Sequence, residues 1–269
     1  MMMTVTEINI YPVKSLGGIS IEGSESTSRG LKYDRRFMLV DENHEFLTQR
    51  DHPQMATIRT AIDGDNLILS SPFDDSITVP LQPRLLPTRT VKVWSSRVHA
   101  HTVSAEADTW LSDYLGMDAR LVHMPDTAER RVSPDFAQNN EVVSFADGYP
   151  VLIASEESLA ELNKRIAQTG AAPVTMDRFR ANIVVKGCAP FAEDTWRDFD
   201  IGDASFRGVK PCTRCQMTTT DQTTGEVRGP EPLRTLATFR DSAKGVKFGM
   251  NLLNTRLGMI RVGDAVVLR

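Results

Sequence analysis

The spacing of short apolar runs and turn residues constrains the fold of this chain more than any other feature. Residues 4–11 alternate apolar and polar side chains, which is typical of a half-buried strand. Residues 58–62 and 67–69 flank Asp63-Gly64-Asp65-Asn66, a sequence typical of a hairpin turn. Short runs of this kind predict a mostly β fold, built as a small barrel or sandwich. Further runs lie at 37–40, 77–79, 91–94, 98–101, 183–185, 205–209 and 260–268.

Three segments are predicted to form peripheral helices. The first begins after Ser104 and ends at Gly116, the second begins after Ser155, and the third begins near Pro232. Because these helices do not alternate regularly with strands, we do not expect a doubly wound parallel sheet. The polar, proline-containing segment 125–140 is predicted to be a linker. It separates an N-terminal domain, 1–124, from a C-terminal domain, 125–269, with the first strand shared between them.

Composition excludes several classes of protein. A net charge of −4 argues against a general nucleic-acid binder, which usually carries a basic surplus. Three cysteines in 269 residues fit a reducing compartment better than a disulfide framework. No stretch approaches the roughly 18 apolar residues of a membrane span, and the first residues lack the features of a secretory signal. We therefore expect a soluble, cytoplasmic protein with no nucleic-acid or membrane partner.

Two of the three cysteines lie in Lys210-Pro211-Cys212-Thr213-Arg214-Cys215, where nearby cations favour thiolate over thiol. Three functional interpretations compete. A zinc site needs more ligands than Cys188 supplies, and all five histidines lie at or before His123. A dithiol redox pair usually begins a helix, which this sequence does not predict. The third interpretation is a single thiolate ligand to a cofactor metal, and two small buried side chains remain the structural alternative.

Other segments carry groups that suit an anionic ligand. Lys14-Ser15 follows the first strand, Arg35-Arg36 precedes an apolar run, and the segment 178–182 enters a buried strand. Each cation alone is better explained as solvated surface charge or as a strand-edge ion pair. The segment 147–150 precedes a strand and a helix start, and backbone N–H groups in such turns attract phosphate.

Taken together, these segments resemble the MOSC superfamily, the proteins related to the C-terminal domain of molybdenum cofactor sulfurase. The resemblance is greatest to the branch that holds the mitochondrial amidoxime-reducing component and its bacterial relatives. It covers nearly the whole chain and implies an N-terminal β-barrel-like module followed by a MOSC β-barrel with a few peripheral helices. The block around Cys215 is its most specific part. The matching segments are 11–15, 34–37, 147–150, 155–159, 178–183, 211–215, 218–221, 231–236, 248–251 and 261–264.

The resemblance also implies a molybdenum cofactor, a metal held by a pterin dithiolene and one protein thiolate. By motif position that thiolate, the metal ligand, is Cys215. A thiolate is a soft donor that suits such a metal, and scattered cations suit an anionic pterin. Asn251 stands where some relatives carry tyrosine. The implied cofactor-binding residues are Lys14, Ser15, Arg36, Gly148, Tyr149, Arg180, Asn182, Thr213, Arg214 and Asn251.

The implied activity is reduction of N-hydroxylated compounds, such as hydroxylamines and amidoximes, to the amine or amidine. Cys215 is the implied catalytic residue. Asp221 is interpreted either as a proton-handling catalytic group or as a turn residue, and Cys212 and Cys188 are expected to be structural. Electrons are expected from a separate ferredoxin, flavoprotein reductase or haem protein, because the cluster-binding cysteines that some bacterial relatives carry are missing here.

The alternative is a carrier that binds the cofactor, or a persulfide on Cys215, without turnover. One family member is fused to a pyridoxal-phosphate sulfurase. Binding of pyridoxal phosphate is therefore implied for the family as a group and not for this chain. This sequence shows no such sulfurase domain.

Overall fold

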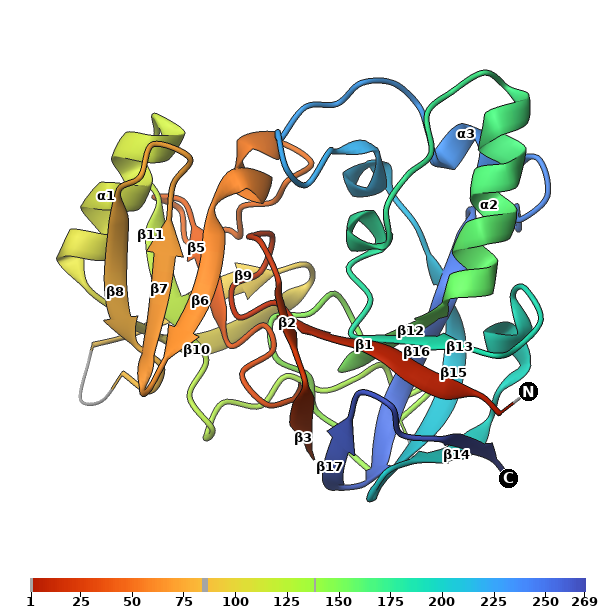
Figure 1. Cartoon of the computed structure of the whole chain (residues 1–269). Coiled ribbons are helices and arrows are strands. Elements are labelled where there is room, and N and C mark those ends of the chain that lie inside the picture. Colours follow the sequence, from red (N-terminus) through yellow and green to blue (C-terminus); the bar gives the residue numbers. More distant parts are fainter. Residues whose placement is uncertain (1, 84–86, 138) are drawn as a thin grey trace.

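The computed structural model describes residues 2–83, 87–137 and 139–269 and confirms the mostly β fold (Figure 1). Two residues on which predictions were made lie outside these described residues. They are Met1, in the segment predicted to lack a secretory signal, and Gln138, in the predicted linker. The described chain forms four sheets and three α-helices. Figure 1 shows the first helix on one side of the molecule and the other two on the opposite side.

The largest sheet has eight strands in the order β18-β14-β15-β16-β12-β13-β1-β2. Its neighbours are antiparallel except for β12 and β13, which run parallel. The sheet curls on itself, because Thr4 in β1 bridges Ala265, directly before β18. The first strand therefore closes the barrel against the last. The bounds are β1 (Thr4–Ile10), β2 (Ile19–Ile21), β12 (Val151–Ser155), β13 (Ile183–Lys186), β14 (Asp198–Ile201), β15 (Ala204–Thr213), β16 (Lys247–Arg256) and β18 (Val266–Leu268).

Apolar side chains fill the inside of this barrel and also cover part of its outside. Ile8, Ile153 and Phe206 are fully buried in the internal cluster. Helix α2 (Glu156–Gln168) packs Leu162 and Ile166 against the outer face of β12 and β13. Because both faces of these two strands are covered, they read as continuous apolar runs rather than as alternating ones.

The remaining sheets are smaller. One sheet contains β5 (Phe37–Val40), β11 (Arg120–His123), β10 (Ser96–Thr102) and β9 (Thr88–Val93) in that order. A meander consists of β6 (Arg59–Asp63), β7 (Asn66–Ser70) and β8 (Ser76–Pro80), and a third sheet orders β17 (Gly258–Arg261), β3 (Gly23–Thr27) and β4 (Gly30–Leu31).

The helix boundaries follow the predicted capping residues. The Ser104 side chain accepts from Ala107 N at the start of α1 (Ala105–Leu115), and Gly116 ends it with φ 69°. Ser155 caps α2 in the same way. The third predicted helix is shorter than expected, because α3 (Leu233–Ala237) ends before Arg240. The predicted last strand is divided into β17 and β18, with Gly263 in the turn at φ 92°.

The chain crosses from one module to the other directly after its first strand. β1 pairs with β13 in the large sheet, whereas Val13 bridges Phe37 in β5 of the smaller sheet. Residues 13–16 therefore lie between the two modules. The domain boundary near residue 125 stays a prediction, since β1 to β4 also lie in sheets of the C-terminal barrel.

Truncation of Leu111 should destabilise the N-terminal module. Leu111 is fully buried where α1 packs in its core, so Leu111→Ala should lower the free energy of unfolding by about 2–5 kcal/mol. Thr109 is exposed on the same helix, and Thr109→Ala should change it by less than about 0.5 kcal/mol. Urea unfolding followed by circular dichroism measures both, and equal effects would contradict this packing.

Candidate functional site

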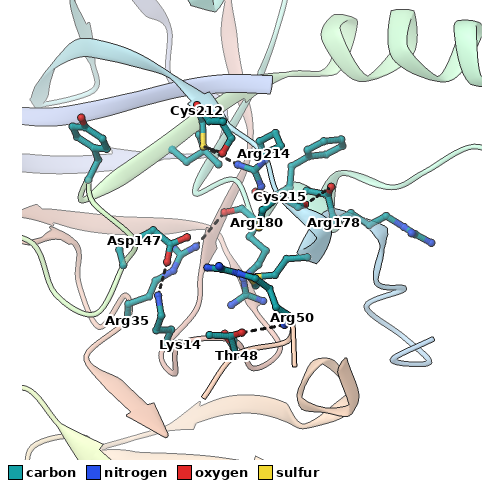
Figure 2. A pocket seen from close by; sticks show the side chains of 18 of the residues that line it. Lys14, Arg35, Thr48, Arg50, Asp147, Arg178, Arg180, Cys212, Arg214 and Cys215 are labelled. Carbon is teal, nitrogen blue, oxygen red and sulfur yellow. Dashed lines mark hydrogen bonds and ion pairs between the residues drawn. The ribbon is translucent and has the colours of Figure 1, made fainter. Parts of the chain in front are cut away.

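A pocket of about 110 Å³ lies where the two modules meet (Figure 2). One wall comes from Thr48 and Arg50 in the N-terminal module. The opposite wall comes from residues 212–215, at the end of β15, and from the segment 178–180. The pocket is therefore assembled by segments far apart in the sequence. The predicted site residues that line it are Lys14, Ser15, Tyr149, Arg180, Asn182, Thr213, Arg214 and Cys215.

The end of strand β15 positions the two cysteines. Cys215 is partly exposed, and its carbonyl oxygen accepts bonds from the Thr218 backbone N–H at 3.1 Å and hydroxyl at 3.0 Å. These bonds begin a short 3-10 helix, which fixes the backbone that carries the Cys215 thiol. Cys212 also lines the pocket, and its sulfur accepts from Arg214 Nη1 at 2.9 Å.

Lys14 is a buried cation that the protein holds with two hydrogen bonds and two aromatic rings. Its ammonium donates to Phe145 O at 3.0 Å and to Asp147 Oδ1 at 2.5 Å. Burial lowers the pKa of Lys14, and the neighbouring Asp147 carboxylate opposes that effect. The rings of Phe46 and Trp94 lie within 5.7 Å of the ammonium. Lys14 therefore presents a fixed charge at the pocket wall.

Arg180 lies deeper in the pocket, on the ring of Tyr11. It ends a 3-10 helix with φ 53°, and its guanidinium lies 4.1 Å from the ring centroid. Its Nη1 donates to Leu16 O at 2.7 Å, which joins the C-terminal module to the turn after β1. Arg35 contacts the same ring at 4.3 Å. Burial raises the pKa of Tyr11 to about 12, although both arginines oppose it.

Tyr149 and Asn182 also lie on the pocket, in different ways. Burial raises the pKa of Tyr149 to about 12, with smaller effects from Asp135 and Cys212, so this phenol stays protonated. The Asn182 amide is held by the protein itself. Its nitrogen donates to Asn9 O at 3.0 Å and to Asp34 at 3.1 Å, while its oxygen accepts from Leu152 N at 3.1 Å.

Arg36 lies elsewhere, which corrects the expectation that it faces this pocket. Arg35 lines the pocket instead, because Arg35 takes a left-handed conformation, φ 48°, and the next side chain turns the opposite way. The Arg36 guanidinium pairs with Asp126 at 2.7 Å and donates to Met124 O. It lines a second pocket together with His101 and His123.

Three other predicted residues do not line the pocket. Gly148 lies between two residues that do, Asp147 and Tyr149. The Asn251 side chain donates to Lys210 O within the sheet at 3.0 Å. Asp221 accepts from the backbone N–H groups of two residues in its own turn, and its other oxygen pairs with Arg178 at 3.2 Å. The catalytic role of Asp221 stays a prediction, and the contacts of its side chain are those of a turn residue.

Sequence reasoning missed Thr48 and Arg50 as pocket residues, and it noted Asp147 only as part of the segment 147–150. Nothing in the local sequence around Arg50 marks it, since Gln49-Arg50-Asp51 resembles an ordinary charged loop. Arg178 was noted only as part of the segment before β13. The structure shows that it lines the pocket while it donates to Thr219 O at 3.0 Å.

The charge and the free polar atoms of the pocket suit an anionic, sulfur-bearing cofactor. Arg180 is only 7% exposed, and its Nη2 has no hydrogen-bond partner. The Nε atoms of Arg50 and Arg214 are likewise buried without partners. Buried donors without partners are costly, so a ligand that accepts from them is expected. With the Cys215 thiol as a soft donor, the residues present fit a molybdenum-pterin group. The lining cations are Lys14, Arg35, Arg50, Arg178, Arg180 and Arg214.

A metal site built on Cys212 and Cys215 would need further protein ligands. Within residues 2–83, 87–137 and 139–269, no group of three or more His, Cys, Asp or Glu side chains could hold a metal ion. Cys188 lies against Glu157 at 3.8 Å, and burial raises the pKa of its thiol to about 11. Cys188 therefore lies apart from the pocket, and burial disfavours its thiolate form.

Comparisons with known proteins decide the family. The model of the MOSC N-terminal beta barrel domain matches residues 2–118, and the model of the MOSC domain matches residues 140–267. A Bos taurus protein named mitochondrial amidoxime reducing component 2 is 34% identical over 282 residues, which is 98% of this chain and 82% of that protein. The chain belongs to the MOSC family.

Two other proteins are similar to most of this chain. Human mitochondrial amidoxime-reducing component 1 is 32% identical over 282 residues, covering 98% of this chain and 82% of that protein. A protein of Oryza sativa subsp. japonica named molybdenum cofactor sulfurase is 33% identical over 264 residues. That match covers 92% of this chain and 32% of the rice protein.

The predicted cytoplasmic location is wrong. MOSC relatives that match 98% of the chain are named mitochondrial components, which points away from plain cytoplasm. Reduced cysteines and a moderate charge are common to both compartments, so composition could not separate them. None of the helices in the described part of the chain is long and apolar enough to cross a membrane.

His123 in the second pocket should make the protein sensitive to acid. Burial first, and then Arg36 and His101, lower the pKa of His123 from 6.5 to about 3. Between these values the unfolded chain binds a proton that the folded chain does not. The free energy of unfolding should therefore fall as the pH drops from 6.5 towards 3, by up to about 1.4 kcal/mol per pH unit.

Replacement of this histidine tests the effect. His123→Gln should flatten the dependence of unfolding free energy on pH between 6 and 4, measured by urea unfolding at several pH values. His99 is exposed on β10, and His99→Gln should leave the slope unchanged. An unchanged slope in His123→Gln would contradict the inferred burial.

Proposed function

We propose that this MOSC protein is a molybdenum-cofactor oxidoreductase that reduces N-hydroxylated compounds to the amine or amidine. The observation that carries the proposal is the Cys215 thiol in a pocket lined by six cations, three of which keep a buried nitrogen without a partner. Similarity to proteins named amidoxime-reducing components over 98% of the chain supports the reaction.

The residues have distinct roles in this proposal. Cys215 would hold the metal, and Arg180, Arg214, Ser15 and Thr213 would hold the pterin and its phosphate. When bound, the cofactor supplies two-electron chemistry for removal of the substrate oxygen, which the protein side chains cannot supply.

The protein would bind, orient and shield the reacting groups. Lys14 is locked by Asp147 and by two aromatic rings, so it stays in place without a ligand. A pocket that is arranged before binding does not have to reorganise during the reaction. The protonated Tyr149 phenol is a hydrogen-bond donor within the same wall.

Electrons would come from a separate protein. The sequence predicts a ferredoxin, flavoprotein reductase or haem protein as donor, and a small N-oxygenated molecule as substrate. Among the described residues, no cluster of three or more His, Cys, Asp or Glu side chains could hold a second redox metal.

The two cysteines should differ sharply on replacement. Cys215→Ser should abolish reduction of benzamidoxime with an artificial electron donor and lower the bound molybdenum, because an alcohol is a poor ligand for a soft metal. Cys212→Ser should keep most of both, because a serine oxygen also accepts from Arg214. Metal analysis and turnover of protein from cells that make the pterin measure the difference. Equal loss in both variants would favour a dithiol mechanism.

Arg180 should be required for cofactor retention. Arg180→Gln removes a charge and the buried donor without a partner, so pterin recovered from purified protein should fall about tenfold or more. Arg240 is a matched control, since it is also largely buried but pairs with Asp194 away from the pocket. Arg240→Gln should retain the pterin even if it lowers stability. Full retention in Arg180→Gln would contradict the assignment.

The carrier alternative predicts a different outcome. A carrier would hold the cofactor tightly, show no turnover of benzamidoxime, and transfer the cofactor to an apo-enzyme. Turnover by the holo-protein at a steady rate excludes this role.

A further inference from the structure

Arg50 is the pocket cation that the protein leaves free. Lys14, Arg35 and Arg178 pair with the carboxylates of Asp147, Asp34 and Asp221. Arg180 and Arg214 donate to the carbonyl oxygens of Leu16 and Phe179. Within the described residues, the Arg50 guanidinium makes no hydrogen bond and no ion pair, and its Nε is buried without a partner.

The Arg50 side chain is nevertheless held in place. Its guanidinium lies 4.3 Å from the ring centroid of Trp94, within the range of a cation–π contact. The Trp94 ring is fixed in turn, because its Nε1 donates to Asp147 at 3.2 Å and Phe46 packs against it at 4.8 Å. A stacked guanidinium keeps its N–H edge available for a ligand.

Trp94 occupies a backbone position that favours small polar residues. It follows β9 in the hairpin turn before β10, with φ 54°. Asn, Asp or Gly is preferred at positive φ in such turns, and a bulky residue there is strained. An observed strain of this kind is a reason to look for function. Here the strained residue provides the surface on which Arg50 rests.

The backbone ties Arg50 to the cysteine segment. Gln216, the residue after Cys215, donates its side-chain amide to Arg50 O at 3.1 Å. Figure 2 shows the Arg50 side chain directed into the pocket that Cys215 also lines. The Arg50 backbone is therefore tied to the segment that carries the thiol, and its side chain lies in the same pocket.

The positive charge of Arg50 is not balanced when the cofactor phosphate binds to the other arginines. Arg180, Arg214 and Arg50 form no ion pair with a carboxylate among the described residues. The nearby carboxylates of Asp147 and Asp34 are already paired with Lys14 and Arg35. A cofactor phosphate carries a charge of about −1.5 to −2, which Arg180 and Arg214 can balance. The charge of Arg50 then remains for a further anion in the same pocket.

We propose that Arg50, stacked on Trp94, forms an anion subsite that selects substrates carrying a carboxylate or phosphate beside the N-hydroxyl group. This inference rests on the proposed function and adds the substrate class. A planar guanidinium suits bidentate contact with such a group.

The kinetic test compares two substrates that differ in one charge. Wild-type holo-protein should show a higher kcat/KM for 4-carboxybenzamidoxime than for neutral benzamidoxime. In Arg50→Gln the ratio of the two values should fall at least about tenfold. Arg97 is exposed on β10 of the same module, and Arg97→Gln should leave the ratio unchanged. An unchanged ratio in Arg50→Gln would overturn the subsite.

A binding test separates failure of the subsite from failure of the proposed function. Titration of resting holo-protein with the product analogue 4-carboxybenzamidine should change tryptophan fluorescence, because Trp94 lies directly against Arg50. Trp94→Phe should lose this signal, and Arg50→Gln should weaken binding at least about tenfold. If wild-type protein reduces neither substrate, the proposed function fails while this titration still decides the subsite.

The pterin and molybdenum content of the variant tests whether Arg50 holds the cofactor instead of the substrate. Arg50→Gln should retain both at the wild-type level. If the variant loses the pterin, Arg50 holds the cofactor rather than the substrate, and the subsite is overturned.

Discussion

One buried carboxylate, Asp34, organises the floor of the pocket. It is 2% exposed, and it accepts from Tyr11 N at 2.8 Å, from Asn182 Nδ2 at 3.1 Å and from Arg35 Nη1 at 2.7 Å. These donors come from the end of β1, from the entry to β13 and from the residue next to Asp34 itself. A buried charge is tolerated only when it is paired and hydrogen-bonded. The three partners are therefore forced to converge, and with them the two modules.

The rest of the site builds on that convergence. Arg35, held by Asp34, lies on one ring with Arg180, although two like charges repel each other. Burial first and then Arg35 lower the pKa of Arg180 to about 10, which leaves its guanidinium charged at neutral pH. The fold thus holds closely spaced cations in a partly dry space. Such an arrangement is costly without a ligand and favourable with an anion, because an anion relieves repulsion and supplies missing acceptors.

The sequence predicted some elements well for local reasons. The caps at Ser104 and Ser155 and the turn at Gly116 depend on bonds within one helical turn, so short motifs reveal them. The thiol at Cys215 was also accessible to prediction, because its motif is contiguous and specific. The prediction put Arg36 in the pocket, whereas its neighbour Arg35, which has a left-handed conformation, lines the pocket instead. Nothing in a local pattern reveals that conformation.

The sequence by itself determined the strand-rich class, the starts of the first two helices and the family pattern that includes Cys215. These depend on alternation, capping and motif spacing, which act over a few residues. Tertiary structure alone decided that Arg50 lines the same pocket as Cys215 and that Arg36 lines a different pocket. The reason is that closure of the barrel and the contact of two modules set these neighbours, and both depend on pairings between residues more than a hundred positions apart.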